Sequence, residues 1–84
     1  MMPLHELLNR IRWDKEFGIG EFEVGYSDRI EQKIIRIPFR RIRFVEGDRF
    51  SFQIDNAEGG VHTIPFHRVR EVYKDGHLIW HRSP

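Results

Sequence analysis

The chain has 84 residues, 14 Lys and Arg against 13 Asp and Glu, no cysteine, and a formal net charge of +1. This length predicts a single domain, residues 1–84, with a modest core, and the lack of cysteine excludes disulfides, thiolate zinc sites and cysteine nucleophiles. No run approaches the roughly 18 apolar residues that cross a membrane, and the N-terminus lacks the pattern of a signal peptide, so we expect a cytoplasmic protein.

The first predicted element is an amphipathic helix. Its apolar stripe follows the spacing i, i+3, i+4 and i+7 with Leu4, Leu7, Leu8 and Ile11. Pro3 suits the first helical position, where its missing N–H has no partner to lose. We expect the helix to end near residues 12–14, before a connector at 17–20 that contains two glycines.

From residue 22 the period of the apolar residues changes from 3.6 to 2, which is typical of half-buried strands. Asp75-Gly76 is a strong signal for a two-residue hairpin turn, and Pro38 and Pro65 belong at strand ends or corners. Strands are expected over residues 22–26, 33–37, 41–44, 50–54, 61–64, 72–74 and 77–80. One helix followed by five to seven short antiparallel strands predicts an α+β domain, with the helix plugging a curled or barrel-like sheet.

Nine residues of the chain occur almost twice. Residues 37–45 read IPFRRIRFV, residues 64–72 read IPFHRVREV, and six of the nine positions are identical. The pattern places paired arginines just after a proline that ends a strand, and the second copy adds His67 beside Arg68. A rigid corner that carries arginines suits phosphate, because the planar guanidinium donates two parallel hydrogen bonds.

The charges are unevenly distributed along the chain. Residues 14–31 have a net charge of −4, whereas residues 33–43 have five basic residues and no acid. Arginine is preferred over lysine by eleven to three. This pattern favours a phosphate-bearing partner, although a surface of ion-pair networks of the thermophilic type explains the composition equally well.

Four short segments carry a resemblance to a known family. They are IRWD at 11–14, YSDR at 26–29, IPFHRV at 64–69 and GHLIW at 76–80. With them the chain resembles the small archaeal domain named for recognition of RNA cyclic-group ends, over nearly its whole length. The resemblance implies an RNA-related binding module, because members stand alone in archaea or are fused to RNA ligase-like phosphoesterases and to nucleotidyltransferases that act on RNA ends.

His67 and Arg68, with Arg70 close by, are the first candidate site for a terminal phosphate. A cyclic phosphate carries one negative charge on two oxygens, which suits a bidentate arginine and a histidine donor. In the alternative interpretation these side chains are structural. Arg68 then pairs with Glu71 or Asp28, and His67 caps a loop carbonyl.

Two further segments are expected to contribute to RNA binding. In the first, Arg29 contacts phosphate and Tyr26 stacks on a base. Asp28 orients either Arg29 or His67. The alternative is an ordinary turn whose aspartate accepts hydrogen bonds from its own backbone. In the second, Arg12 and Trp13 end the helix, and Trp13 either stacks on a nucleobase or belongs to the rim of the core.

Arg41 and Arg43 share a strand face in the densest basic stretch of the chain. On one face of a strand they follow a phosphate backbone without reading its sequence. The competing interpretation is an ion-pair ladder with Glu21 and Glu23 on a neighbouring strand, because the two acids alternate with the same period.

Together the residues and the resemblance predict a non-catalytic RNA-binding module that recognises a terminal, cyclic phosphate in RNA processing or repair. The spacing of the histidines matches no zinc signature, so neither a metal nor a cofactor is expected. A histidine phosphoesterase would use two separated His-x-Ser/Thr motifs, whereas here Thr63 directly follows His62. The alternative function is a domain that docks onto an RNA-processing enzyme through some of the eleven aromatic residues. The oligomeric state stays open.

Overall fold

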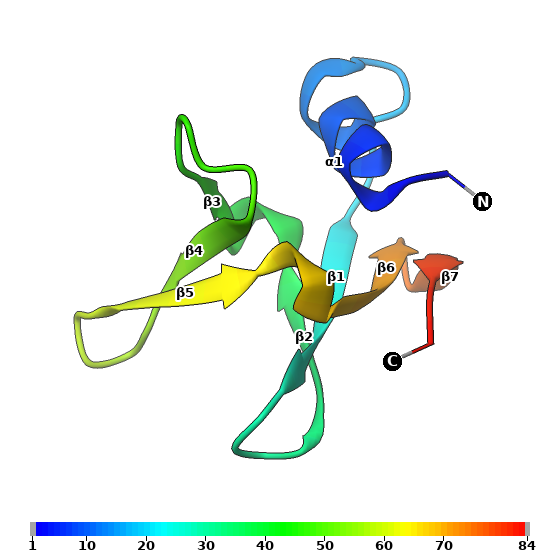
Figure 1. The fold of residues 1–84 in the computed structure, drawn as a ribbon. Helices are drawn as coiled ribbons and strands as arrows, with labels where there is room; N and C mark the ends of the chain where they lie inside the picture. The colour runs from blue at the N-terminus through cyan, green and yellow to red at the C-terminus, as the bar shows by residue number, and fades with distance from the viewer. Residues whose placement is uncertain (1, 84) are drawn as a thin grey trace.

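The computed structural model describes residues 2–83, which form one α-helix and seven strands (Figure 1). The strands make two antiparallel sheets, of order β2-β1-β6-β7 and β3-β4-β5. The elements are α1 (Leu4–Trp13), β1 (Phe22–Asp28), β2 (Lys33–Pro38), η1 (Phe39–Arg41), β3 (Arg43–Phe44), β4 (Ser51–Asp55), β5 (Val61–Pro65), η2 (Phe66–Arg68), β6 (Val69–Lys74) and β7 (His77–His81), where η marks a 3-10 helix. The α+β class is confirmed. The curled or barrel-like sheet is wrong, because the strands of the described residues divide into two sheets and close no barrel.

The predicted helix is confirmed, and its apolar stripe is buried. Pro3 lies at the N-cap, one position before the first helical residue. At the other end the carboxylate of Asp14 accepts hydrogen bonds from the N–H groups of Glu16 and Phe17, at 3.0 and 3.1 Å. This local turn ends the helix after Trp13, because the Asp14 side chain takes N–H groups that a longer helix would use for its own backbone hydrogen bonds. At ten residues, α1 is too short to cross a membrane, and it is the only α-helix within residues 2–83.

The repeated sequence forms a repeated structure. Pro38 and Pro65 have nearly the same backbone angles, φ −60° and ψ 138° against φ −63° and ψ 139°. Each proline ends a strand because it has no N–H to donate, and one turn of 3-10 helix follows. The first corner leads from β2 to β3 and the second from β5 to β6, so each corner carries the chain from one sheet to the other.

The first corner makes one strand shorter than the sequence predicts. Residues 39–41 are in the 3-10 helix η1, and β3 covers only Arg43 and Phe44. The N–H of Ile42 donates to the carbonyl of Phe39 at 3.0 Å, so it is not available to a neighbouring strand. Arg41 and Arg43 therefore do not share the face of one strand.

Phe66, at the start of the second corner, lies in the centre of the core. Its ring centroid is 4.8 Å from that of His5, 5.2 Å from that of Phe52 and 6.1 Å from that of Phe44. These contacts join α1 to the three-stranded sheet, and Phe52 itself is fully buried. Figure 1 shows α1 at the top of the view, on one side of the strands.

Phe50 is a second correction. The alternation at 50–54 predicts a buried Phe50 in a strand, yet its side chain is 82% exposed. The carboxylate of Asp48 accepts hydrogen bonds from the N–H groups of Phe50 and Ser51, at 2.8 and 3.1 Å. Phe50 is thereby held in the turn that precedes β4, so β4 begins only at Ser51 and the Phe50 side chain points into solvent.

The closing hairpin is confirmed. Asp75 and Gly76 have φ of 50° and 82°, the positive values that a tight hairpin turn requires. The Asp75 carboxylate also accepts a hydrogen bond from the N–H of Glu21 at 2.9 Å, and the N–H of Asp75 donates to the carbonyl of Glu21 at 2.7 Å. The turn therefore fixes the start of β1 beside the end of β6.

Candidate nucleic-acid interface

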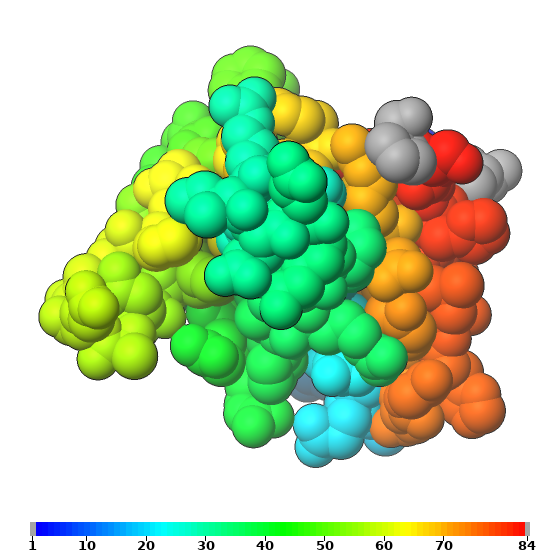
Figure 2. Space-filling model, turned by 90° about the horizontal axis from the view of Figure 1, so that it is seen from below, coloured from blue at the N-terminus to red at the C-terminus, as the bar shows by residue number. Residues whose placement is uncertain are grey.

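Three of the predicted site residues meet in a hollow between the β1–β2 and β4–β5 hairpins, which we call the hairpin hollow. It has a volume of about 600 Å³. Tyr26 and Asp28 line it from β1, and Arg41 lines it from η1. Figure 2, which views the molecule from below, shows the end of the β1–β2 hairpin beside the projecting β4–β5 hairpin.

The charged groups of the hairpin hollow are already engaged. A guanidinium nitrogen of Arg41 donates to the Asp55 carbonyl at 3.1 Å, and Arg43 forms an ion pair with the Asp55 carboxylate at 2.9 Å. The Asp28 carboxylate accepts hydrogen bonds from the N–H groups of the turn that follows it, at 2.8 and 2.9 Å. The turn interpretation of Asp28 is therefore confirmed, and Tyr26 is only 6% exposed.

Arg68 is not among the residues that line the hairpin hollow, but its charge reaches Asp28 there. The pKa of the Asp28 carboxyl is lowered, chiefly by the hydrogen bond from the Glu31 N–H and further by the charges of Arg68 and His62. Arg68 forms no ion pair with any acid among residues 2–83, so neither predicted structural partner binds it directly. Arg29 is exposed in the turn after β1 and likewise forms no ion pair within this range.

The proposed arginine ladder exists with different partners. Glu23 on β1 pairs with Arg36 of β2, and Glu21, just before β1, pairs with Arg40 of η1. Arg36 also lies over the ring of Tyr73, 3.6 Å from its centroid. The ion pairs of this surface are Arg36–Glu23 at 2.6 Å, Arg40–Glu21 at 3.5 Å and Arg43–Asp55 at 2.9 Å.

His67 lies in a different hollow, between the N-terminal end of α1 and the second corner. Its volume is about 640 Å³. Its basic side chains are His5, Arg49, His67 and Arg82, and no aspartate or glutamate of the described residues lines it. We call it the acid-free hollow. It shares no residue with the hairpin hollow, and Arg68, the sequence neighbour of His67, lines neither of the two.

Two arginines hold the second corner by its carbonyl groups. Arg82 donates from Nε to the Val69 carbonyl at 2.9 Å and from Nη2 to the Phe66 carbonyl at 2.8 Å. Arg70 donates from Nη1 to the His67 carbonyl at 2.8 Å, while its buried Nε has no partner within residues 2–83. Burial lowers the pKa of the Arg82 guanidinium, and the charge of Arg70 lowers it further. The corner thus carries two neighbouring positive charges that no described acid neutralises.

Arg49 and Phe50 form the opposite wall of the acid-free hollow. Arg49 is exposed, and it forms no hydrogen bond or ion pair with any group in the described part of the chain. Phe50 exposes 82% of its side chain because the Asp48 turn directs it outward. A free guanidinium and an exposed ring therefore flank the same concave surface.

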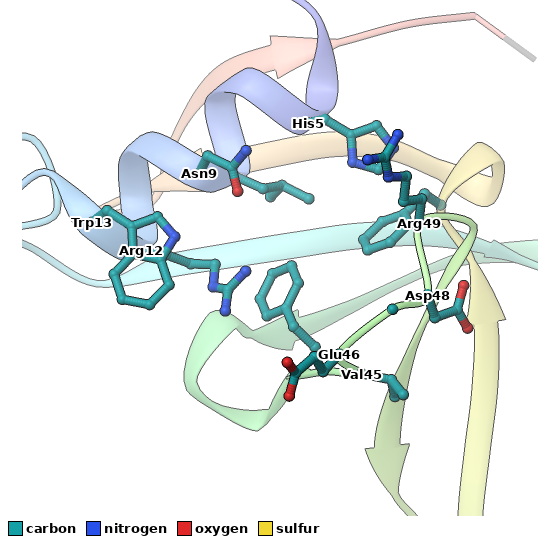
Figure 3. A pocket seen from close by; sticks show the side chains of 12 residues that line it. His5, Asn9, Arg12, Trp13, Val45, Glu46, Asp48 and Arg49 are labelled. Carbon is teal, nitrogen blue, oxygen red and sulfur yellow. The ribbon is translucent and has the colours of Figure 1, made fainter.

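A third hollow, of about 910 Å³, continues the acid-free hollow along α1 and faces the loop between β3 and β4 (Figure 3). We call it the wide hollow, and the two together the helix groove. Arg12 and Trp13 line its far end, where the Arg12 guanidinium lies 4.0 Å from the centroid of Phe44 and 4.7 Å from that of Trp13. Trp13 is 71% exposed, whereas Trp80 is 6% exposed, so only the first tryptophan offers a surface to a partner.

Comparison with known proteins places the chain in a family. A family model described as the MJ1316 RNA cyclic group end recognition domain matches residues 1–82. The chain belongs to this family. The UPF0248 protein of Metallosphaera sedula is 32% identical to this chain over 82 residues, which are 98% of this chain and 95% of the relative. No solved structure matches the chain.

The match confirms the resemblance carried by the four sequence segments. The family's description names recognition of an RNA end and no reaction. Among residues 2–83, no three His, Cys, Asp or Glu side chains lie close enough to hold a metal ion.

Sequence reasoning missed four residues of the acid-free hollow, which are His5, Arg49, Phe50 and Arg82. One of them had a local signal. Asp48 precedes Phe50 by two residues, the spacing at which an aspartate caps a turn, so residue 50 belongs to a loop. The other three come from distant parts of the chain, and only the tertiary structure brings them together.

Proposed function

We propose that this domain is a non-catalytic RNA-binding module that holds a terminal, cyclic phosphate of RNA in the acid-free hollow, as a step in RNA processing or repair. The observation that carries the proposal is the composition of that hollow, which has four basic side chains and no described acid. Family membership supports RNA as the ligand that brings the phosphate.

An anion would stabilise this hollow in its observed form. Arg70 and Arg82 lie close enough for the charge of one to lower the pKa of the other, and both are held by carbonyl groups rather than by carboxylates. Carbonyl groups satisfy the N–H donors but leave the net charge in place. A bound phosphate oxygen would add the missing negative charge, and arginine pairs with phosphate through strong hydrogen bonds between two ionised groups.

The proposal assigns distinct roles to the predicted site residues. His67, Arg49 and Arg82 contact the phosphate, and Arg70 positions His67 through the His67 carbonyl. A second group contributes to sequence-independent attraction for the RNA backbone from the hairpin hollow and its surroundings. Its members are Arg29, Arg41, Arg43 and Arg68, whereas Asp28 and the buried Tyr26 only shape the hollow.

The test is fluorescence anisotropy with short RNAs that differ only at the 3′ end. An RNA that ends in a cyclic phosphate is expected to bind at least about tenfold more tightly than the same RNA with a hydroxyl end, since one charged hydrogen bond supplies that much. Replacing His67 by alanine should reduce this difference. An RNA with a linear phosphate shows whether the ring itself is recognised.

Equal affinity for the cyclic-phosphate and hydroxyl ends would exclude end recognition. Absence of binding even at low salt would exclude RNA altogether, because electrostatic attraction to the backbone is strongest there.

A further inference from the structure

We infer that the helix groove selects an unpaired RNA end, with the terminal phosphate in the acid-free hollow and a nearby base stacked on Trp13 in the wide hollow. This inference rests on the proposed function and adds the class of RNA that the site takes. It assigns the wide hollow as a base-binding site.

The two hollows form one continuous surface. His5, Arg49 and Phe66 line both of them. The hollows measure about 640 and 910 Å³, and each is as large as the pockets that usually hold an entire small-molecule ligand. A phosphate group alone is far smaller than this surface, so the groove has room for at least one attached nucleoside.

The charges change along the groove. The wide hollow contains Arg12 but also Glu46 and Asp48, whereas every ionisable side chain that lines the acid-free hollow among the described residues is basic. Asp48 is occupied, because it accepts hydrogen bonds from the Ser51 hydroxyl at 2.5 Å and from two N–H groups. Glu46 forms no ion pair with any basic side chain of residues 2–83. A free carboxylate repels phosphate but accepts hydrogen bonds from the amino groups of bases, so this end suits a base.

Trp13 supplies the surface on which a base stacks. Its side chain is 71% exposed at the last position of α1. Arg12 holds it in place, because the guanidinium lies over both the Trp13 ring and the half-buried Phe44 ring, at 4.7 and 4.0 Å from their centroids. Figure 3 shows Arg12 and Trp13 at one end of the wide hollow, with His5 and Arg49 at the other end, where the acid-free hollow begins. A pre-positioned aromatic ring loses little freedom when a base stacks on it.

A base in a duplex does not meet these conditions. It is stacked on its own strand, and its hydrogen-bonding edge is used by the opposite strand, so it must leave the helix before it reaches Trp13. An unpaired end needs no such step. The groove should therefore discriminate between a single-stranded end and a blunt duplex end that carries the same phosphate.

The test compares three RNAs with the same cyclic-phosphate end: a single strand, a duplex with a two-nucleotide 3′ overhang and a blunt duplex. The single strand and the overhang are expected to bind equally, and the blunt duplex about tenfold more weakly. Replacing Trp13 by alanine should weaken single-strand binding about tenfold. Replacing Trp13 by phenylalanine should retain most of the binding.

Two controls separate this inference from the proposed function. An RNA whose last two nucleotides lack bases but keep the cyclic phosphate should bind wild type and the Trp13→Ala variant equally. Ile30→Ala removes another exposed apolar side chain, 90% exposed in the β1–β2 turn, and should change nothing. Equal binding of blunt and overhanging ends, or no effect of Trp13→Ala, overturns the inference while phosphate dependence remains. Loss of phosphate dependence itself overturns the proposed function.

Discussion

Replacing Arg49 by glutamate is expected to lower the affinity for a cyclic-phosphate RNA end by about 100-fold, or about 2.7 kcal/mol. The guanidinium lines both parts of the helix groove and forms no ion pair within residues 2–83. The change therefore removes a donor to the phosphate and places a negative charge beside it. Because Arg49 is exposed, the free energy of unfolding should change by less than about 0.5 kcal/mol. Anisotropy and thermal unfolding measure the two quantities.

Arg29→Glu is the matched control for this variant. Arg29 is also exposed and without an ion pair in the described residues, but it lies in the turn of the β1–β2 hairpin. Both substitutions lower the net charge equally, so long-range attraction to RNA weakens equally. We expect a loss within about threefold for Arg29→Glu. Comparable losses for the two variants would show that total charge, rather than the acid-free hollow, governs binding.

Replacing Phe52 by alanine is expected to remove about 3–5 kcal/mol of the free energy of unfolding. Phe52 has no exposed surface, pairs with Ile64 across the sheet and lies 5.2 Å from the ring of Phe66. A domain of this size has a total stability of only about 4–13 kcal/mol, so the variant should lose much of its resistance to urea. Urea titration followed by circular dichroism gives both free energies.

Phe50→Ala is the internal comparison for Phe52→Ala. It removes the same side chain two positions earlier, where 82% of the side chain is exposed. We expect a change in the free energy of unfolding below about 0.5 kcal/mol. A large loss from Phe50→Ala would favour the alternation predicted from the sequence, which buries Phe50, whereas a small loss from Phe52→Ala would contradict the buried position of Phe52.

The helix and the two corners were predictable because short-range physics determines them. The spacing of Leu4, Leu7, Leu8 and Ile11 defines one buried face whatever the rest of the chain does. Pro38 and Pro65 cannot donate a hydrogen bond to a ladder, so each ends its strand. The arrangement into two sheets was not predictable, because alternation shows which residues face inward but not which strands pair.

The site was predicted only in part, and the geometry of the second corner explains why. His67 and Arg68 are neighbours in sequence, which suggested one joint site. They lie in a 3-10 helix, where consecutive side chains point about 120° apart. His67 therefore lines the acid-free hollow, while Arg68 acts on Asp28 at the hairpin hollow. The partners of His67 in space, Arg49 and Arg82, are distant from it in sequence.

The most direct test is a titration of the ¹⁵N-labelled protein with a short single-stranded RNA that ends in a cyclic phosphate. Saturable chemical-shift changes are expected at the amides of Arg49, Phe50, His67 and Arg82, the residues that line the acid-free hollow. Changes confined to the hairpin hollow, around Tyr26, or changes that are the same with a hydroxyl-ended RNA, would contradict the placement of the RNA end in the acid-free hollow.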